Sequence, residues 1–410
     1  MSFHLTSQQC LDEFRKTCPV KKYENETEAE FMKRLTYLIR LTMQRLCIEN
    51  HALAQKNANM RDLSNEEKER ISSFWKRMDR GGLMPLLNLD YYKSYAKVCE
   101  DASKLPYYIP DSFFYAFLDE YFTNPFRSAP IDDKNIYSLL FSDVNRPKEI
   151  ARYIHGVFYD PTYMPISREK FVAICETHDE VVVKASVLSG GGHGVTFWKN
   201  TEPVANLLKP MDIEPWQTVQ GKIAPVRSFK QFVIEETIKQ HPILAAINSS
   251  SVNTIRIMTL ERNGNIDVLS SVLRMGINGS RVDNCCSGGI VAGIDYNGVI
   301  KDNAYNQKGD LFLHHPNGTD FAGVKIPAFN ECVELAIKLA YRMVSFSRLI
   351  SWDFAIDENG EPVLIEMNIS YGELDFHQLC NGPIFGDKTE DVLNEVFDNS
   401  FTLRKLLGWK

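Results

Sequence analysis

The sequence has 410 residues, of which 44% are hydrophobic, 24% charged and 11% aromatic, which is typical of a globular protein with about two or three domains. The 46 basic and 53 acidic residues give a formal net charge of −7. This charge argues against a protein that coats nucleic acid, although it leaves room for a local basic pocket.

Nine cysteines are scattered along the chain without a CxxC pair, which indicates a reducing compartment. The first residues contain no apolar signal core, and no apolar run approaches the roughly 18–20 residues that a membrane span needs. We therefore expect a cytoplasmic protein without a transmembrane segment, which can still associate with a membrane-bound partner.

Residues 1 to about 105 are predicted to form a helical region. Apolar residues recur at helical spacing between residues 28 and 50, for example at Leu35, Leu38 and Leu46. Ser64 followed by Glu67 is a capping-box pattern and predicts a helix start. A packing role fits this region best, and a basic substrate-docking face is the alternative.

From residue 106 to residue 410 the pattern is α+β. Short helices are predicted at 132–141, 147–158 and 166–176, the last with Ser167 as its N-cap. A strand, a glycine-rich loop and a second strand follow within 180–198, and residues 228–238 contain another short strand.

Three Asn-Gly pairs between apolar strands predict β-hairpins, at residues 263–264, 297–298 and 359–360. Asn-Gly favours a two-residue type I′ turn because both of its positions need positive φ. A helix is predicted at 329–346, between the last two hairpins. The sheets are therefore expected to be antiparallel.

The last hairpin carries two acidic residues among apolar neighbours. A two-residue turn at Asn359–Gly360 places Asp353 opposite Glu366, and Asn368 projects to the same face. Like charges buried together need compensation, and two carboxylates with an amide oxygen suit Mg²⁺. In the alternative, the carboxylates face solvent or one of them is protonated.

A second group of residues suits phosphate. Lys184 interrupts an apolar strand and would need an anionic partner if it is buried. The following loop, Gly190–Gly191–Gly192–His193–Gly194, can expose backbone N–H groups to a phosphate, although glycine-rich hairpin loops also occur without ligands. It matches neither a P-loop nor a dinucleotide-binding fingerprint.

Two further strands carry candidate ligand-binding residues. An apolar strand ends at Glu235 and Glu236, where the main chain could pair with an adenine edge or simply present solvated acids. Arg256 lies on a strand of the first hairpin, and a two-residue turn at 263–264 would place it opposite Ser271. Arg274 on the partner strand could share its surface, unless both arginines face solvent.

The order of these motifs resembles the ATP-grasp superfamily, and in particular its sugar-transfer-associated branch. The resemblance covers residues 125 to 390 and depends mainly on "VNTIR" and on the Asp353, Glu366 and Asn368 spacing. It implies an ATP-grasp fold whose two α+β parts, about 125–245 and 246–400, grip ATP between antiparallel sheets.

The resemblance also implies roles for individual residues. Those implied to bind the nucleotide are Lys134, Lys184, Gly190, Gly191, Gly192, His193, Glu235, Glu236 and Ile238, with His241 or Gln240 at the ribose. Asp353, Glu366 and Asn368 would hold Mg²⁺. Arg256 would steady the acyl phosphate or the γ-phosphate, and Arg274 with Asn284 would orient a carboxylate. The residues after Asn368 depart from the family's common proline-glycine turn, so substrate identity does not transfer.

The implied function is ATP-dependent carboxylate–amine ligation through an acyl phosphate, in the modification of surface polysaccharide or another glycoconjugate. The substrates would be a small-molecule or sugar-linked carboxylate and an amine. One alternative is a small-molecule or sugar kinase on the same scaffold. Another is a non-catalytic nucleotide-binding partner of a membrane-associated glycosyltransferase, which would not need the retained metal ligands and lysines.

Overall fold

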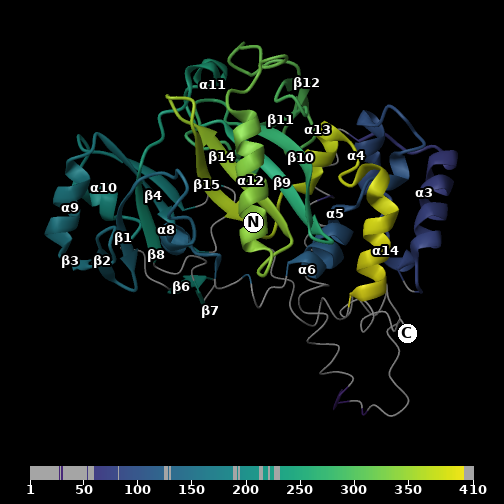
Figure 1. Cartoon of the computed structure of the whole chain (residues 1–410), viewed down its shortest axis with the longest axis horizontal. Helices are drawn as coiled ribbons and strands as arrows, with labels where there is room; N and C mark the ends of the chain where they lie inside the picture. Colours follow the sequence, from purple (N-terminus) through teal and green to yellow (C-terminus); the bar gives the residue numbers. More distant parts are fainter. Residues whose placement is uncertain are drawn as a thin grey trace.

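The computed structural model describes residues 60–81, 83–123, 128, 131–187, 192, 194–211, 216–219, 222–225 and 231–400, together with residues 27, 29, 30 and 53. Two antiparallel sheets lie next to each other, and a group of helices lies at the far side of the larger sheet (Figure 1). This is the α+β architecture with antiparallel sheets and a helical N-terminal region that the sequence predicts.

The smaller main sheet has six strands in the order β3-β2-β1-β8-β4-β5. Its strands are β1 (Glu149–Ile154), β2 (Val157–Tyr159), β3 (Pro165–Ile166), β4 (Glu180–Ala185), β5 (Val195–Lys199) and β8 (Gln231–Glu236). Phe171 of α9 (Arg168–Glu176) and Leu207 of α10 (Val204–Leu208) pack with Val181 and Ile234 of the sheet in one apolar core. The strands β6 (Trp216–Val219) and β7 (Lys222–Pro225) pair separately.

Most of the elements predicted for this part are confirmed. The short helices η6 (Lys134–Ile136) and α8 (Tyr137–Leu140) form, and the Ser167 hydroxyl caps α9 by accepting the N–H of Lys170. The predicted helix at 147–158 is wrong, because β1 and β2 form a hairpin there. His155 and Gly156 both have positive φ, 48° and 86°, so a tight turn and pairing of β1 with β8 override the local helical pattern.

The larger sheet has seven strands in the order β13-β12-β11-β10-β9-β14-β15. They are β9 (Thr254–Arg262), β10 (Asn265–Met275), β11 (Ile290–Ile294), β12 (Ile300–Tyr305), β13 (Leu311–Phe312), β14 (Leu349–Ile356) and β15 (Pro362–Asn368). The remaining elements of this part are α11 (Pro242–Ile247), η7 (Cys285–Ser287), the predicted helix α12 (Phe329–Met343), α13 (Leu374–Asn381) and η8 (Gly386–Lys388).

The two faces of β9 serve different purposes. Ile255 and Ile257 pack in one core with Ala336 and Leu339 of α12. The alternate residues point to the other face, where Leu260 joins the core of the helical region. Arg256 lies on this second face, so the cavity and the helical region share one side of the sheet.

The helical region extends from α3 (Asn65–Met78) to α6 (Asp119–Phe122) and includes η2 (Met84–Leu86), α4 (Tyr91–Val98), η3 (Leu105–Tyr107), α5 (Asp111–Phe113) and the π-helical turn η4 (Phe114–Leu118). The C-terminal helix α14 (Thr389–Asn399) packs with it (Figure 1). The helix predicted at 28–50 lies outside the described residues, except for residues 29 and 30.

The three Asn-Gly hairpins differ in their turns. Asn263 and Gly264 have φ values of 52° and 80° and form the predicted two-residue turn. At 297–298 and 359–360 only the glycine has positive φ, and a three-residue loop forms. Asp295 and Asp357 explain this difference, because each carboxylate accepts two backbone N–H groups inside its loop.

The capping box predicted at Ser64 is present in full, with the Ser64 hydroxyl and the Glu67 carboxylate each accepting the other's backbone N–H. We expect Ser64→Ala to lower the free energy of unfolding by about 1 kcal/mol in a urea titration. Ser73, exposed within the same helix, is the matched control. Ser73→Ala should be neutral or slightly stabilising, because alanine has the higher helix propensity. Equal losses for both variants would contradict a role for the cap.

Candidate active site

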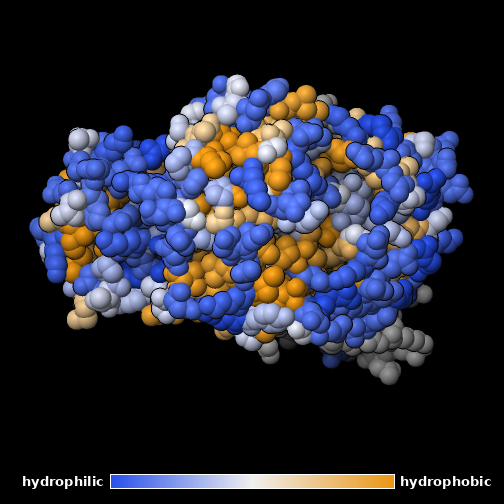
Figure 2. Space-filling view, turned by 45° about the horizontal axis from the view of Figure 1, so that its top comes forward, coloured by the Kyte–Doolittle hydropathy of each residue, from blue (hydrophilic) through white to orange (hydrophobic). Residues whose placement is uncertain are grey.

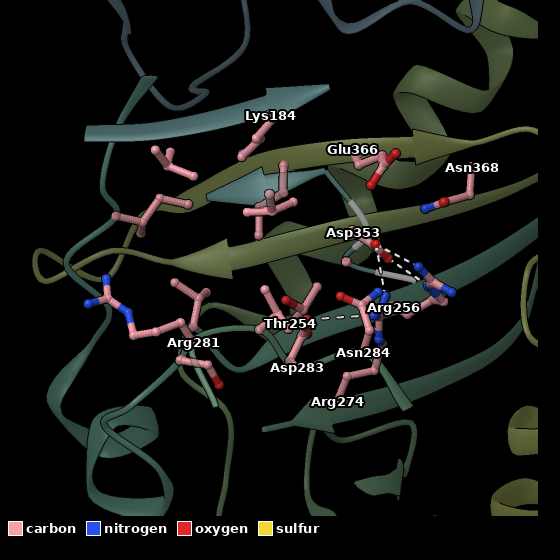
Figure 3. A pocket seen from close by; sticks show the side chains of 18 of the residues that line it. Lys184, Thr254, Arg256, Arg274, Arg281, Asp283, Asn284, Asp353, Glu366 and Asn368 are labelled. Atoms are coloured by element: carbon pink, nitrogen blue, oxygen red, sulfur yellow. Dashed lines mark hydrogen bonds and ion pairs between the residues drawn. The ribbon is translucent and has the colours of Figure 1, made fainter. Parts of the chain in front are cut away.

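A cavity of about 1220 Å³ lies between the two sheets. Lys184 from β4 and Phe197 from β5 line one side, and residues from β9, β10, β14 and β15 line the other. Figure 3 shows Lys184 on a strand across from Glu366, and Asp353 next to Arg256 and Arg274.

Arg256, Arg274 and Asp353 lie on the three neighbouring strands β9, β10 and β14. Arg256 pairs with Asp353 on one side and with Val272, not the predicted Ser271, on the other. A β-bulge between Val268 and Ser270 causes the difference. Since a shift of one residue reverses the face of every side chain, the bulge is what places Arg274 on the same face as Arg256.

Asp353 lies opposite Glu366, as predicted, although the turn between them is not the predicted one. The three-residue loop shifts the register by one residue, so that Ile356 and not Asp357 pairs with Pro362. A bulge between Asp353 and Phe354 then restores the original register. The two departures from ideal hairpin geometry cancel at the acidic pair.

Asp353 is only 3% exposed, and two arginines compensate its charge. Arg256 donates from Nε to Oδ1 and from Nη2 to Oδ2, both at 2.7 Å, and Arg274 donates from Nη1 to Oδ2 at 3.2 Å. Burial opposes ionisation, but Arg256 outweighs it and holds the pKa of Asp353 below its ordinary value. Asp353 is therefore a buried carboxylate in its charged form.

Glu366 has a cation partner from the short helix η6, which lies beside the smaller main sheet. Lys134 Nζ lies 2.6 Å from Glu366 Oε1, and the backbone N–H of Lys134 donates to Ser186 O just beyond β4. Burial disfavours the charged amine, but Glu366 outweighs it and raises the pKa of Lys134. This ion pair connects the two sides of the cavity.

The oxygen donors of β14 and β15 fit Mg²⁺. Asp353, Glu366 and Asn368 all line the cavity, and Asn368 contributes a side-chain hydrogen bond that helps to lower the pKa of Asp353. Within the described part of the chain, no three His, Cys, Asp or Glu residues form a metal-binding cluster. Two carboxylates and an amide are nevertheless sufficient for Mg²⁺, which typically completes its coordination with water and phosphate oxygens.

The opposite wall of the cavity suits a nucleotide. Lys184 Nζ donates to Glu235 Oε2 at 2.6 Å. Glu236 and Ile238 line the cavity, whereas Glu235 lies beside Lys184 outside the lining. Gly192 also lines the cavity, and Gly190, Gly191 and His193 lie outside the described residues.

The two residues considered for the ribose occupy different positions. His241 does not line the cavity, and its ring Nδ1 accepts the N–H of Ile243 at the start of α11. Gln240 lines the cavity. Its side-chain amide donates hydrogen bonds to the carbonyls of Asn248 and Ser251 and accepts one from the side chain of Asn253. Gln240 therefore also orders the loop that precedes β9.

Glu373 and Asp283 contact the arginines and were missed by sequence reasoning. Glu373 Oε2 lies 2.7 Å from Arg256 Nη1. Asp283 Oδ1 lies 3.5 Å from Arg274 Nη2, and burial raises the pKa of Asp283. For Asp283 the adjacent Asn284 was a signal, but no local pattern indicates that Glu373 approaches a strand more than a hundred residues away.

His377 of α13 is fully buried and lies near Arg256 and Arg274. Burial lowers the pKa of His377 to about 3. Below pH 6.5, His377 therefore takes up a proton in the unfolded chain but stays neutral in the folded protein. The His377 contribution to stability is therefore lost as pH falls, by about 2 kcal/mol between pH 7 and pH 5. Urea titrations at these pH values should show this loss for the wild type and a smaller one for His377→Gln. An equal pH dependence in both proteins would contradict this assignment.

No helix in the described part of the chain is both long enough and apolar enough to cross a membrane. The face shown in Figure 2 is mainly hydrophilic, with smaller hydrophobic patches between the polar residues.

The comparison with curated proteins gives no match. Among solved structures, D-alanyl-alanine synthetase A from Vibrio cholerae is 12% identical over 67% of this chain and 67% of its own, with a TM-score of 0.39. VanG D-Ala:D-Ser ligase from Enterococcus faecalis is 12% identical over 67% of this chain and 63% of its own, with a TM-score of 0.41. The biotin carboxylase domain of 2-oxoglutarate carboxylase from Hydrogenobacter thermophilus is 14% identical over 67% of this chain, with a TM-score of 0.39, and only 48% of that chain is covered.

The family comparison is more specific. The model of the sugar-transfer associated ATP-grasp family matches residues 119–394, about two thirds of the chain. The match includes both main sheets and all the residues that line the cavity between them except Asp111 and Tyr115. The chain therefore belongs to the sugar-transfer associated ATP-grasp family and has the ATP-grasp fold.

Proposed function

We propose that the protein is an ATP-dependent ligase that joins a carboxylate to an amine through an acyl phosphate. The observation that carries this proposal is the opposition of Lys184 on one sheet to Asp353 and Glu366 on the other, within one cavity. Cations suit the triphosphate and the oxygen donors suit its metal ion, so Mg²⁺ and ATP fit the cavity together.

The base and the phosphates of the nucleotide each have matching residues in the cavity. The apolar side chains of Val182, Ile238 and Met367 line the cavity and can contact the base. Lys184, held by Glu235, and Lys134 can neutralise phosphate oxygens.

Gly192 offers a close backbone approach to the phosphates, since its φ of 76° disfavours a side chain there. Bound at Asp353, Glu366 and Asn368, Mg²⁺ would neutralise charge on the phosphates.

The proposed reaction needs no protein nucleophile. A carboxylate oxygen of the first substrate attacks the γ-phosphorus, the bond to the β-phosphate bridging oxygen breaks, and ADP leaves. The amine then attacks the acyl carbon, phosphate leaves, and the amine nitrogen loses a proton. Arg256 would stabilise charge on the transferred phosphoryl group, and Arg274 with Asn284 would orient the carboxylate.

The size of the cavity supports a second substrate. Its volume of about 1220 Å³ exceeds the roughly 300–1,000 Å³ typical of a single small-molecule site. This favours an enzyme over a scaffold that only binds a nucleotide. The family description supports a substrate linked to sugar transfer, in polysaccharide or glycoconjugate modification. The cytoplasmic location and the glycosyltransferase partner stay predictions from the sequence.

A pooled screen of carboxylates and amines tests the proposal. The full chain is incubated with ATP and Mg²⁺, and phosphate release is measured with each pool, followed by mass spectrometry of the product. We expect phosphate release that needs both a carboxylate and an amine, and an amide product. A stable phosphorylated product formed without an amine would identify a kinase instead.

A further inference from the structure

Arg256 is held by two separate carboxylates. Its Nε and Nη2 bind Asp353, and its Nη1 lies 2.7 Å from Glu373 Oε2. Arg256 is only 4% exposed, so it depends on these partners for compensation of its charge. If Asp353 serves as a metal ligand, the metal ion competes with Arg256 and Arg274 for the two oxygens of Asp353. Glu373 is then the carboxylate that remains with Arg256.

The backbone around Glu373 is fixed in an unusual conformation. Tyr371 and Glu373 both have left-handed φ values, 57° and 61°, which are uncommon for residues other than glycine. A Cβ on Gly372 would lie 2.4 Å from Ser351 Oγ and 3.0 Å from Met258 Cε, so only glycine fits between them. Gly372 is therefore packed tightly against β9 and β14, directly before Glu373.

The helical region provides the other support for this segment. The backbone N–H of Leu374 donates to the Tyr115 hydroxyl at 3.0 Å, and the Tyr115 ring stacks on Tyr371 with centroids 5.0 Å apart. Tyr115 belongs to the π-helical turn η4, and such turns are often found at functional sites. The helical region thus contacts the residue next to Glu373.

We infer that Glu373 is a positioning residue, which anchors Arg256 independently of Asp353 so that Arg256 stays directed into the site when Asp353 engages the metal. The Tyr115 hydroxyl holds Glu373 in place. The metal-dependent part of this inference rests on the proposed function and deepens it. It also gives the helical region a task in the active site.

A double-mutant cycle on thermal stability tests the anchor without nucleotide or metal. In Glu373→Gln, Arg256 keeps Asp353, and in Asp353→Asn it keeps Glu373. The double variant has neither carboxylate. We therefore expect its melting temperature to fall by more than the sum of the two single shifts. Additive shifts would overturn the inference.

Binding of Mn²⁺, used as the probe in place of Mg²⁺, tests the metal-dependent part. Electron paramagnetic resonance measures the free Mn²⁺ in the presence of a non-hydrolysable ATP analogue. In Glu373→Gln, Arg256 has only Asp353 and competes harder for it, so we expect about a tenfold loss of Mn²⁺ affinity. Glu373→Asp should recover part of it, and Glu358→Gln, an exposed site in the adjacent hairpin loop, should have no effect.

Tyr115→Phe should cause a smaller loss of Mn²⁺ affinity than Glu373→Gln. Tyr341→Phe, at an exposed tyrosine on α12, should cause no loss. Unchanged Mn²⁺ affinity in Glu373→Gln would overturn the inference. If the wild-type protein bound no Mn²⁺ with the analogue, the proposed function would fail, and the stability cycle would still decide whether Glu373 anchors Arg256.

Discussion

Asp353→Ala is expected to lower the free energy of unfolding by about 3–5 kcal/mol, because it leaves buried arginines without their main partner. Asp353 accepts three hydrogen bonds from Arg256 and Arg274, which are 4% and 2% exposed. Glu373 compensates only part of this charge. The measurement is the free energy of unfolding at pH 7 from a guanidinium titration.

Asp302→Ala is the matched control for this experiment, since Asp302 is an exposed carboxylate on β12 of the same sheet. Its effect should stay within about 0.5 kcal/mol. The pH dependence adds a second check. The lowered pKa of Asp353 means that its stabilising contribution is present above about pH 4 and is lost as pH falls through the folded-state pKa. A loss below 1 kcal/mol at pH 7 would show that the arginines do not depend on Asp353.

Glu366→Gln is expected to reduce turnover by at least a hundredfold, roughly the effect of removing one electrostatic contact to the transition state. The substitution keeps the shape of the side chain. It removes the negative charge of Glu366, which pairs with Lys134 and is proposed to bind the metal ion. Glu366 is a partly exposed residue of β15, so the fold should remain intact. The measurement is ADP release with a substrate pair identified by the screen.

Glu361→Gln is the control for turnover, because Glu361 is exposed in the loop of the same hairpin. It should retain the wild-type rate. Circular dichroism and the melting temperature establish that Glu366→Gln is folded. Wild-type ADP release by a folded Glu366→Gln protein would remove Glu366 from the mechanism.

The predictions that succeeded from sequence were those with local chemical causes. The capping box at Ser64, the cap at Ser167 and the turn at Asn263–Gly264 all depend on residues within a few positions. The opposition of Asp353 and Glu366 was also correct, although a loop and a bulge had to cancel for it to hold. At the Asn263–Gly264 hairpin the reverse holds, because the turn was correct and the predicted pairing of Arg256 with Ser271 was wrong.

The predictions that failed depended on tertiary contacts. The hairpin at 149–159 follows from pairing with β8, a strand more than 70 residues later. The bulge after Val268 decides which face Arg274 occupies, and no residue pattern there reveals it. To predict that arginines compensate the charge of Asp353, one must also know that β9, β10 and β14 are neighbours in the sheet. In the Asn359 loop, by contrast, Asp357 two residues earlier was a readable signal for a three-residue turn.

The central claim is that one cavity takes ATP and its metal ion as a unit, with Lys184 on one side and Glu366 on the other. Calorimetric titration of ATP into the full chain, with and without Mg²⁺, tests it most directly. We predict that Mg²⁺ tightens ATP binding, and that Lys184→Met and Glu366→Gln each weaken binding in the presence of Mg²⁺. ATP binding that is indifferent to Mg²⁺ and to both substitutions, or no ATP binding at all, would contradict the claim.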